Sequence, residues 1–180
     1  MQGLIILANG FEDSEAIITI DLLRRSKIKL DLVSLDKELN ITSSHQVKYI
    51  CDKSYQDINL SKYDFLIIPG GQAVFKYHLN SNLTKSIVKF FMDQKRLVAC
   101  ICAAPMILGV MGYLKGKNYT CFPGCESSDY EGHYQNQKVV VDGNIITAQA
   151  MGATFEFCQA IITKLESADK ASEVIASVYY

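Results

Sequence analysis

The 180-residue sequence predicts an α/β fold in which helices cover both faces of a mostly parallel, doubly wound sheet. Two observations carry this prediction. Short, continuous apolar runs, typical of buried strands, alternate with segments whose apolar residues recur at helical spacing. Turns rich in Gly, Pro and small residues follow several of these runs. With 49% hydrophobic residues, the chain can bury one sizeable core, so we expect residues 1–180 to form a single domain.

Apolar runs and helical spacing divide the first half of the chain into strands and one long helix. The expected strands are residues 4–8, 28–35 and 64–68. Between the first two, apolar residues recur every three to four positions over residues 15–25, which predicts a helix. Two short extended pieces are expected within residues 41–51, on either side of the polar residues 43–46. The Pro-Gly-Gly of residues 69–71 is a strong turn signal directly after the third strand.

The second half continues this alternation of strands and helices. A helix is expected over residues 81–94, and it leads into an apolar strand that follows Arg96. A turn at residues 115–117 precedes a short strand, and residues 122–134 are predicted to form a loop rich in Gly, Ser, Asp and Glu. The remaining predicted elements are a hairpin with an Asp-Gly turn in residues 139–147 and helices over residues 153–165 and 168–178.

The most informative segment is residues 96–108, where the apolar strand changes to small residues and a proline before a helical pattern begins. Cys102 at this change would stand on a sharp turn, with free helix N–H groups pointing toward its sulfur. That arrangement favours a thiolate with a lowered pKa. The N–H groups of Ala103 and of the Gly70-Gly71 turn could bind a developing oxyanion. The alternative is a small buried hydrophobe. We accept that alternative for Cys100, Cys121 and Cys158.

Two further side chains could move protons for Cys102. Glu15 lies near the first turn of the first helix, where a carboxylate could equally be a solvated charge favoured by the helix dipole. Spacing alone does not distinguish Glu15 from Glu12. His133 lies in the predicted loop, where polar residues often serve function, and could equally be a surface imidazole. Residues 10–15, 69–71 and 102–105 all follow strands, so we expect them at the ligand-binding edge of the sheet.

Composition and charge argue against several classes of partner. A formal net charge of −1 gives no reason to expect nucleic acid or an anionic membrane. No apolar run approaches membrane-spanning length, and the first residues lack the basic start of a signal peptide, so we expect a cytoplasmic protein. The six cysteines are too scattered for a disulfide scaffold, and their spacings are not the common zinc pairings. We therefore expect no metal.

Six motifs stand in the order and spacing of the ThiJ/PfpI superfamily. They are residues 10–16, 20–25, 68–71, 101–105, 132–134 and 155–157. The resemblance covers essentially the whole chain, and it is closer to the branch that holds the parkinsonism-associated protein deglycase and bacterial ThiJ-like proteins. It implies a flavodoxin-like sandwich, a homodimer, and a reactive cysteine at a nucleophile elbow.

Carried over residue by residue, the resemblance assigns roles to the candidate site. Cys102 matches the nucleophile, and Glu15 matches the acid that hydrogen-bonds its sulfur. His133 matches a nearby histidine, while Gly71 and Ala103 match the backbone oxyanion donors, with Gly70 in support. The protease-like branch usually has a histidine directly after its cysteine, where this chain has alanine. A protease or amidohydrolase is therefore a weaker interpretation.

Three positions bear on how far the resemblance extends. Close relatives have an arginine where this chain has His45, which leaves open a basic contact to the site across the dimer. The Gly-Pro-Gly turn of relatives is Ala-Met-Gly here, at residues 150–152, so we expect a different pocket wall. Cys51 matches a second, exposed family cysteine near the dimer interface, to which we assign at most a minor redox role.

The resemblance and the residues together predict a cofactor-independent enzyme for reactive carbonyls. Cys102 would add to an α-oxoaldehyde such as methylglyoxal, or to its early adducts with proteins, and form a hemithioacetal. Glu15 would shuttle protons, and water would release a hydroxy acid such as lactate. The alternative is an oxidative-stress sensor or redox-regulated chaperone in which Cys102 becomes a sulfinate. A role in thiazole biosynthesis is weaker, since residues 69–71 are too short for a P-loop and lack its lysine.

Overall fold

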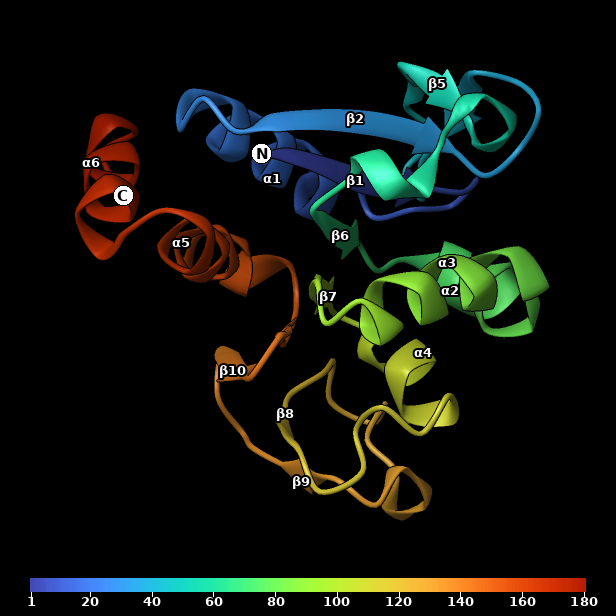
Figure 1. Cartoon of the computed structure of the whole chain (residues 1–180), viewed down its shortest axis with the longest axis vertical. Helices are drawn as coiled ribbons and strands as arrows, with labels where there is room; N and C mark the ends of the chain where they lie inside the picture. The colour runs from blue at the N-terminus through green and yellow to red at the C-terminus, as the bar shows by residue number, and fades with distance from the viewer.

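The structure is a computed structural model that describes all 180 residues. A seven-stranded sheet forms its centre (Figure 1). Its strands are β1 (Gln2–Leu7), β2 (Lys29–Ser34), β5 (Lys53–Ser54), β6 (Phe65–Ile68), β7 (Leu97–Ile101), β10 (Val139–Asp142) and β11 (Ile145–Ala148). They lie in the order β10-β11-β7-β6-β1-β2-β5, and every neighbouring pair is parallel except the β10–β11 hairpin. This confirms the predicted doubly wound, mostly parallel sheet.

Helices cover both faces of this sheet. On one side lie α1 (Asp13–Arg25), α5 (Thr154–Leu165) and α6 (Ala168–Ser177), and on the other lie α2 (Gln72–Lys76), α3 (Asn82–Asp93) and α4 (Pro105–Val110) (Figure 1). α5 packs on both α1 and α6, and α3 packs on β6 and β7. Side-chain caps begin α1, α3 and α6: the Ser81 hydroxyl accepts a hydrogen bond from the Thr84 N–H of α3, for example.

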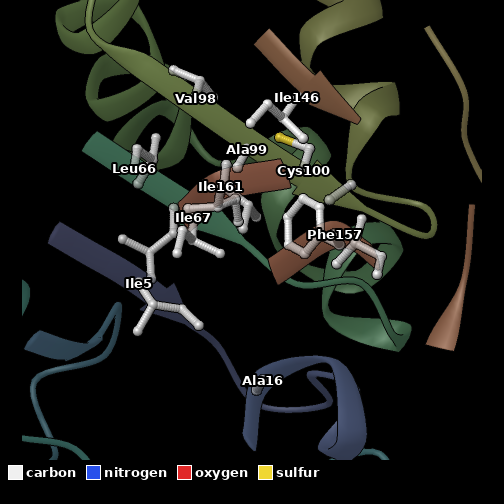
Figure 2. Packing of buried hydrophobic residues seen from close by; sticks show 14 of the residues in the cluster. Ile5, Ala16, Leu66, Ile67, Val98, Ala99, Cys100, Ile146, Phe157 and Ile161 are labelled. Carbon is white, nitrogen blue, oxygen red and sulfur yellow. The ribbon is translucent and has the colours of Figure 1, made fainter. Parts of the chain in front are cut away.

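The core explains why the central strands are apolar on both faces. Ile5 of β1, Ile67 of β6 and Ala99 of β7 are fully buried. Figure 2 shows this layer meeting Phe157 and Ile161 of α5. Burying a side chain of the size of Ile or Phe stabilises the fold by roughly 1.5–3 kcal/mol relative to leaving it exposed. A buried strand therefore has no polar face to alternate with its apolar one.

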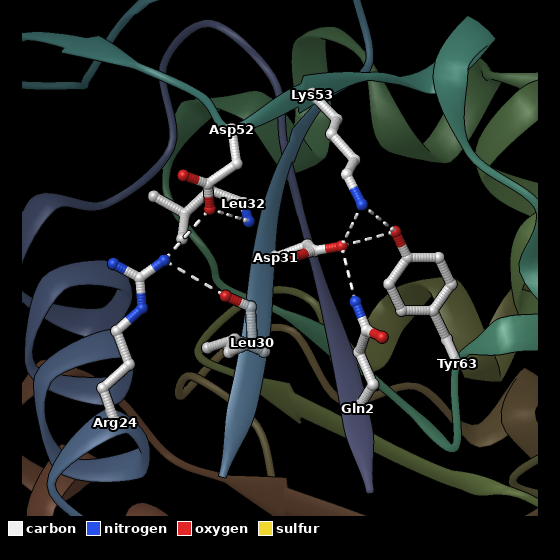
Figure 3. Close-up of polar contacts among 8 residues, drawn as sticks. All are labelled: Gln2, Arg24, Leu30, Asp31, Leu32, Asp52, Lys53 and Tyr63. Atoms are coloured by element: carbon white, nitrogen blue, oxygen red, sulfur yellow. Dashed lines mark hydrogen bonds and ion pairs between the residues drawn. The ribbon is translucent and has the colours of Figure 1, made fainter. Parts of the chain in front are cut away.

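Polar contacts join the strands at the opposite end of the sheet from their carboxyl termini (Figure 3). The Asp31 carboxylate of β2 accepts hydrogen bonds from Lys53 (2.6 Å), the Tyr63 hydroxyl (2.7 Å) and Gln2 (2.8 Å). Burial would raise the pKa of Asp31, but the hydrogen bonds from Lys53 and Tyr63 hold it below its usual range. These groups satisfy one another, so this end of the sheet is structural.

Several short elements lie outside the main sheet. β3 (Asn40–Thr42) and β4 (Lys48–Ile50) pair as an antiparallel hairpin, which confirms the two extended pieces, and β8 (Asn118–Tyr119) pairs with β9 (His133–Tyr134). The 3-10 turns are Tyr55–Asp57, Leu60–Lys62, His78–Asn80, Ser128–Tyr130 and Met151–Ala153. Neither β9 nor α2 follows from the sequence, because two to five residues are too few for a periodic pattern. None of the helices is both long and apolar enough to cross a membrane.

Candidate active site

Three strand ends meet at one edge of the sheet. β1, β6 and β7 are neighbours, and the loops after their carboxyl ends carry Glu15, the Gly70-Gly71 turn and Cys102. The strand order reverses between β1 and β6. The chain runs from β1 to β2 and β5 on one side, and then returns to β6 on the other side of β1. Such switch points are where open α/β sheets bind ligands. The edge predicted from the three turns is therefore formed.

Cys102 stands on a strained backbone turn. Its φ of 65° lies in the left-handed region, which residues with a side chain rarely adopt. Its N–H donates to the carbonyl of Ala148 (3.0 Å), and its own carbonyl accepts from the N–H of Phe122 (2.7 Å). Neighbours on both sides thus hold the turn between β7 and α4. Strain that is maintained in this way is typical of a nucleophile elbow.

Glu15 lies beneath the same point and is only 1% exposed. Its Oε2 accepts a hydrogen bond from the Gly70 N–H (2.8 Å), whereas its Oε1 is buried and has no hydrogen-bond partner. A Cβ at Gly70 would lie 2.8 Å from Oε2 of Glu15 and 2.9 Å from Sγ of Cys102. The carboxyl and the sulfur therefore meet across a glycine that leaves just enough space for both.

The two neighbouring glutamates have different roles. Glu12 is the N-cap of α1, and its Oε2 accepts a hydrogen bond from the Glu15 N–H (2.7 Å). That bond satisfies a free N–H of the first turn and helps to fix Glu15 in the buried position. Glu12 itself faces the cavity above Cys102. Geometry thus separates the two carboxylates that spacing alone does not distinguish.

Two backbone N–H groups point at the sulfur. The N–H groups of Gly71 and Ala103 both hydrogen-bond to Cys102 and act to lower its pKa. Gly71 has a φ of 89°, and a Cβ there would lie 2.5 Å from the nitrogen of Glu12, so a glycine is required. An oxyanion that forms beside the sulfur would lie within reach of these donors.

The surroundings of Cys102 contradict the expectation that its pKa is lowered. Burial and the adjacent Glu15 carboxylate raise the pKa of the thiol to about 12, which the two N–H groups only partly oppose. Burial also raises the pKa of Glu15, to about 7. The expectation was wrong because it considered the effect of the helix dipole on the thiolate and left out the effect of burial, which disfavours a charged sulfur. Glu15 and Cys102 form a coupled pair that loses its first proton near pH 7.

Cys102 opens into a cavity of about 570 Å³. Apolar and polar side chains both line it. We call the apolar side chains Phe75, Met106 and Phe122 the apolar wall of the cavity, and the polar side chains Glu12, Ser44 and His45 its rim. His45 is mostly exposed, and its Nδ1 lies 2.9 Å from Oδ2 of Asp13. The histidine thus borders the site of its own chain. A second hollow of about 470 Å³, beside α5, contains neither Cys102 nor Glu15.

The structure does not bring His133 to this cavity. His133 is exposed on β9, and its N–H donates to the carbonyl of Lys117 (2.8 Å). Its ring is not among the groups that line the pocket, where Phe122 lies instead. Phe122 and Phe75 could not be predicted from the sequence as residues of the site, because the path of a loop and the face of a very short helix leave no periodic signal. The Phe-Pro-Gly turn at residues 122–124 was the available indication.

Cys51 and residues 150–152 also lie differently from expectation. Cys51 is 3% exposed within this chain, and burial raises the pKa of its thiol to about 12, so it is not the exposed cysteine expected. None of residues 150–152 is among the residues that line the cavity. Cys100, Cys121 and Cys158 are fully buried, as the structural interpretation of those residues requires.

One side-chain group has the spacing of a metal site. Glu12, Asp13 and His45 each offer a donor atom, and these atoms lie within 4.8 Å of one another. Burial would raise the pKa of Asp13, but hydrogen bonds from Ser43 and His45 hold it below its usual range. The pairing of Asp13 with His45 accounts for their closeness without an ion.

Known proteins resemble this chain over nearly its full length. The model of the DJ-1/PfpI family matches residues 1–164. Protein DJ-1alpha of Drosophila melanogaster is 36% identical over 182 residues, which cover 99% of this chain and 84% of the relative. A deglycase of Pyrococcus abyssi is 30% identical over 92% of this chain and 100% of its own length. The crystal structure of Drosophila melanogaster DJ-1beta matches with a TM-score of 0.91 and 31% identity, over 99% of this chain and 98% of that one. The chain spans 40% of the length of Protein DJ-1 homolog B of Arabidopsis thaliana.

Proposed function

The chain belongs to the DJ-1/PfpI family, and on that premise we propose that it is a stress-response enzyme for reactive carbonyls. Its substrates would be α-oxoaldehydes such as methylglyoxal, or their early adducts with proteins, and no cofactor would be needed. One observation carries the proposal: the Cys102 sulfur lies between a buried carboxyl and two backbone N–H groups. The similarity to a deglycase supports it.

In the first step, the sulfur of Cys102 adds to the aldehyde carbon. The ionised Glu15 accepts the thiol proton as the carbon–sulfur bond forms, so a free thiolate need not accumulate. The aldehyde oxygen becomes an oxyanion that the N–H groups of Gly71 and Ala103 stabilise. The buried Oε1 of Glu15, which has no partner, is an acceptor available for this proton.

In the second step, Glu15 first returns the thiol proton to the oxyanion, which gives a neutral hemithioacetal and an ionised carboxylate. Glu15 then takes the proton from the hemithioacetal carbon, the hydroxyl proton of that carbon passes to the adjacent carbonyl oxygen, and Glu15 delivers its proton to the adjacent carbon. The product is a thioester between Cys102 and a 2-hydroxy acid. Water then cleaves the carbon–sulfur bond, which releases lactate from methylglyoxal and restores the thiol. The overall change is the addition of one water molecule to the aldehyde, so no oxidant or reductant is consumed.

We predict that the purified protein converts methylglyoxal to lactate and that Cys102→Ala or Glu15→Gln lowers kcat/KM by at least about 100-fold. Because Glu15 must be ionised to accept the thiol proton, kcat/KM should rise with pH through about 7. Lactate measured enzymatically over pH 5–9 gives both results. Absence of lactate, or undiminished lactate from Cys102→Ala, would contradict the proposal.

The geometry favours carbonyl chemistry over peroxide sensing. Peroxide reacts with the thiolate, and burial together with the Glu15 carboxylate raises the pKa of Cys102 to about 12. Addition to an aldehyde proceeds with transfer of the thiol proton to Glu15, and the N–H groups of Gly71 and Ala103 stabilise the oxyanion that forms. A sulfinate at Cys102 remains chemically compatible with the N–H groups of Gly71 and Ala103, but the resting thiol is poorly suited to form it.

We also propose that the chain acts as a homodimer in a reducing compartment, the cytoplasm. All six cysteines are free, which fits reducing conditions. The β3–β4 hairpin exposes apolar side chains, which supports a partner there.

A further inference from the structure

We propose that the cavity above Cys102 selects neutral carbonyl compounds with an apolar or aromatic substituent and excludes compounds that carry a carboxylate. This names the substrate class of the proposed function and rests on it. The selectivity depends on two features, an apolar wall and a rim without a free cation. Both can nevertheless be tested through the reactivity of Cys102, without turnover of a substrate.

The apolar wall comes from three separate segments. Phe75 belongs to α2, Met106 to α4, and Phe122 to the loop after β8. Phe75 and Phe122 are 46% and 47% exposed, which is unusual for phenylalanine and leaves apolar surface facing the cavity. The N–H of Phe122 donates to the carbonyl of Cys102, so this residue is fixed beside the nucleophile. An aromatic substituent on the substrate would pack against this apolar surface.

The size of the cavity fits a substituent larger than a methyl group. About 570 Å³ is within the range of pockets that hold drug-sized ligands, and methylglyoxal would fill only a small part of it. Apolar side chains line the cavity together with Cys102, so the remaining space is available to an apolar substituent. Burying an aryl group there removes apolar surface of both partners from water.

The charges on the rim act against an anionic substrate. No lysine or arginine lines the cavity. Glu12 presents a carboxylate, which the N–H of Glu15 holds in place at 2.7 Å. His45 is the one basic side chain on the rim, and the Asp13 carboxylate already pairs with it. A substrate carboxylate would therefore lose water, find no free cation of this chain on the rim, and be repelled by Glu12.

Alkylation of Cys102 tests both features without requiring turnover. We would measure, by peptide mass spectrometry, the rates for iodoacetate (anionic), iodoacetamide (neutral) and N-phenyliodoacetamide (neutral, aromatic). Each rate is divided by the rate with glutathione. Because the three reagents attack the same sulfur, the effect of any change in its pKa cancels when their rates are compared. We expect iodoacetate to be disfavoured and the phenyl reagent favoured, each about tenfold relative to iodoacetamide.

Matched variants assign these ratios to residues. Glu12→Gln keeps an oxygen for the helix cap and should restore much of the iodoacetate rate. Phe122→Ala should reduce the preference for the phenyl reagent at least about fivefold. Tyr179→Ala removes an aromatic ring that is 99% exposed outside the cavity and should change neither ratio. Ratios in the wild-type protein that equal those of glutathione would overturn the proposal, whatever the variants do.

Turnover separates this inference from the proposed function. We expect kcat/KM for phenylglyoxal to exceed that for 4-carboxyphenylglyoxal by about tenfold or more. If methylglyoxal is converted but the two aryl compounds react equally, the selectivity is refuted and the activity stands. If the alkylation ratios hold and no aldehyde is converted, the proposed function fails and the cavity's selectivity stands.

Discussion

At the scale of single residues, the ionised carboxylate of Glu15 is the group of the site that is least favourable for folding. It is buried in the first turn of α1, and only one of its two oxygens has a partner. A polar group in such a place usually destabilises the fold. Carboxyls with a raised pKa beside a nucleophile are also typical of catalytic proton handlers. The same burial therefore weakens the fold and prepares the carboxyl for chemistry.

This burial predicts a pH dependence of stability that Glu15→Gln removes. The folded pKa of Glu15 is about 7, above its ordinary 4.5, so folding disfavours the ionised form. The free energy of unfolding should therefore fall as pH rises from about 4.5 to 7, by up to about 3 kcal/mol from this group. Urea denaturation at pH 4 and pH 8 measures this change. From pH 4 to pH 8, the free energy of unfolding of Glu15→Gln should rise by this amount relative to that of the wild type.

A second variant identifies the cause of this pH dependence. Cys102→Ala leaves Glu15 buried and should keep most of the decline in stability between pH 4 and pH 8. If the decline disappears in Cys102→Ala, the thiol and not burial sets the pKa of the carboxyl.

At the scale of elements, the site depends on the turn between β6 and α2. A Cβ at Gly70 would lie 2.5 Å from Cβ of Cys102 and 2.8 Å from Oε2 of Glu15. Both neighbours are fixed, one by the strained elbow and one by the helix cap, so neither can give way cheaply. The Pro-Gly-Gly sequence thus sets the distance between the nucleophile and its proton acceptor.

Gly70→Ala should therefore separate Cys102 from Glu15. We expect at least about a 100-fold loss of methylglyoxal turnover and a destabilisation of about 1–3 kcal/mol. Ser81→Ala is the matched control, because loss of the α3 cap costs about 1 kcal/mol without touching the site. Normal kcat/KM in Gly70→Ala would show that the close contact of carboxyl and sulfur is not needed.

At the scale of the whole molecule, the β3–β4 hairpin is an unpartnered apolar surface. It stands outside the main sheet and exposes Leu39, Val47 and Ile50, the last at 73%. Its turn contributes Ser44 and His45 to the cavity rim. A second copy of the chain seated on this hairpin would bury these side chains and hold the rim in position.

We predict that sedimentation velocity will show a species of twice the 20.1 kDa chain mass. Ile50→Asp should shift it toward the monomer, because a buried carboxylate at an interface is strongly unfavourable. Val141→Asp, at a half-exposed valine of β10, is the control and should remain dimeric. A monomeric wild-type protein, or equal dissociation of both variants, would refute this interface.

The order of the longer strands and helices, the three turns at one sheet edge and the elbow at Cys102 follow from the sequence. They can be predicted because apolar periodicity and the backbone preferences of glycine and proline act over a few residues. Glu15 was a candidate on the same grounds, although its distinction from Glu12 came from the resemblance and then from the cap geometry.

Only the tertiary structure decided which loop residues face the cavity and how the pair is protonated. Phe122 lines the site and His133 does not, because the path of a loop depends on the elements that anchor it. The pKa of Cys102 rises rather than falls, because desolvation and the charge of Glu15 come from segments far away in the sequence. Local patterns determine where a side chain enters the fold, whereas its electrostatics depend on everything that packs around it.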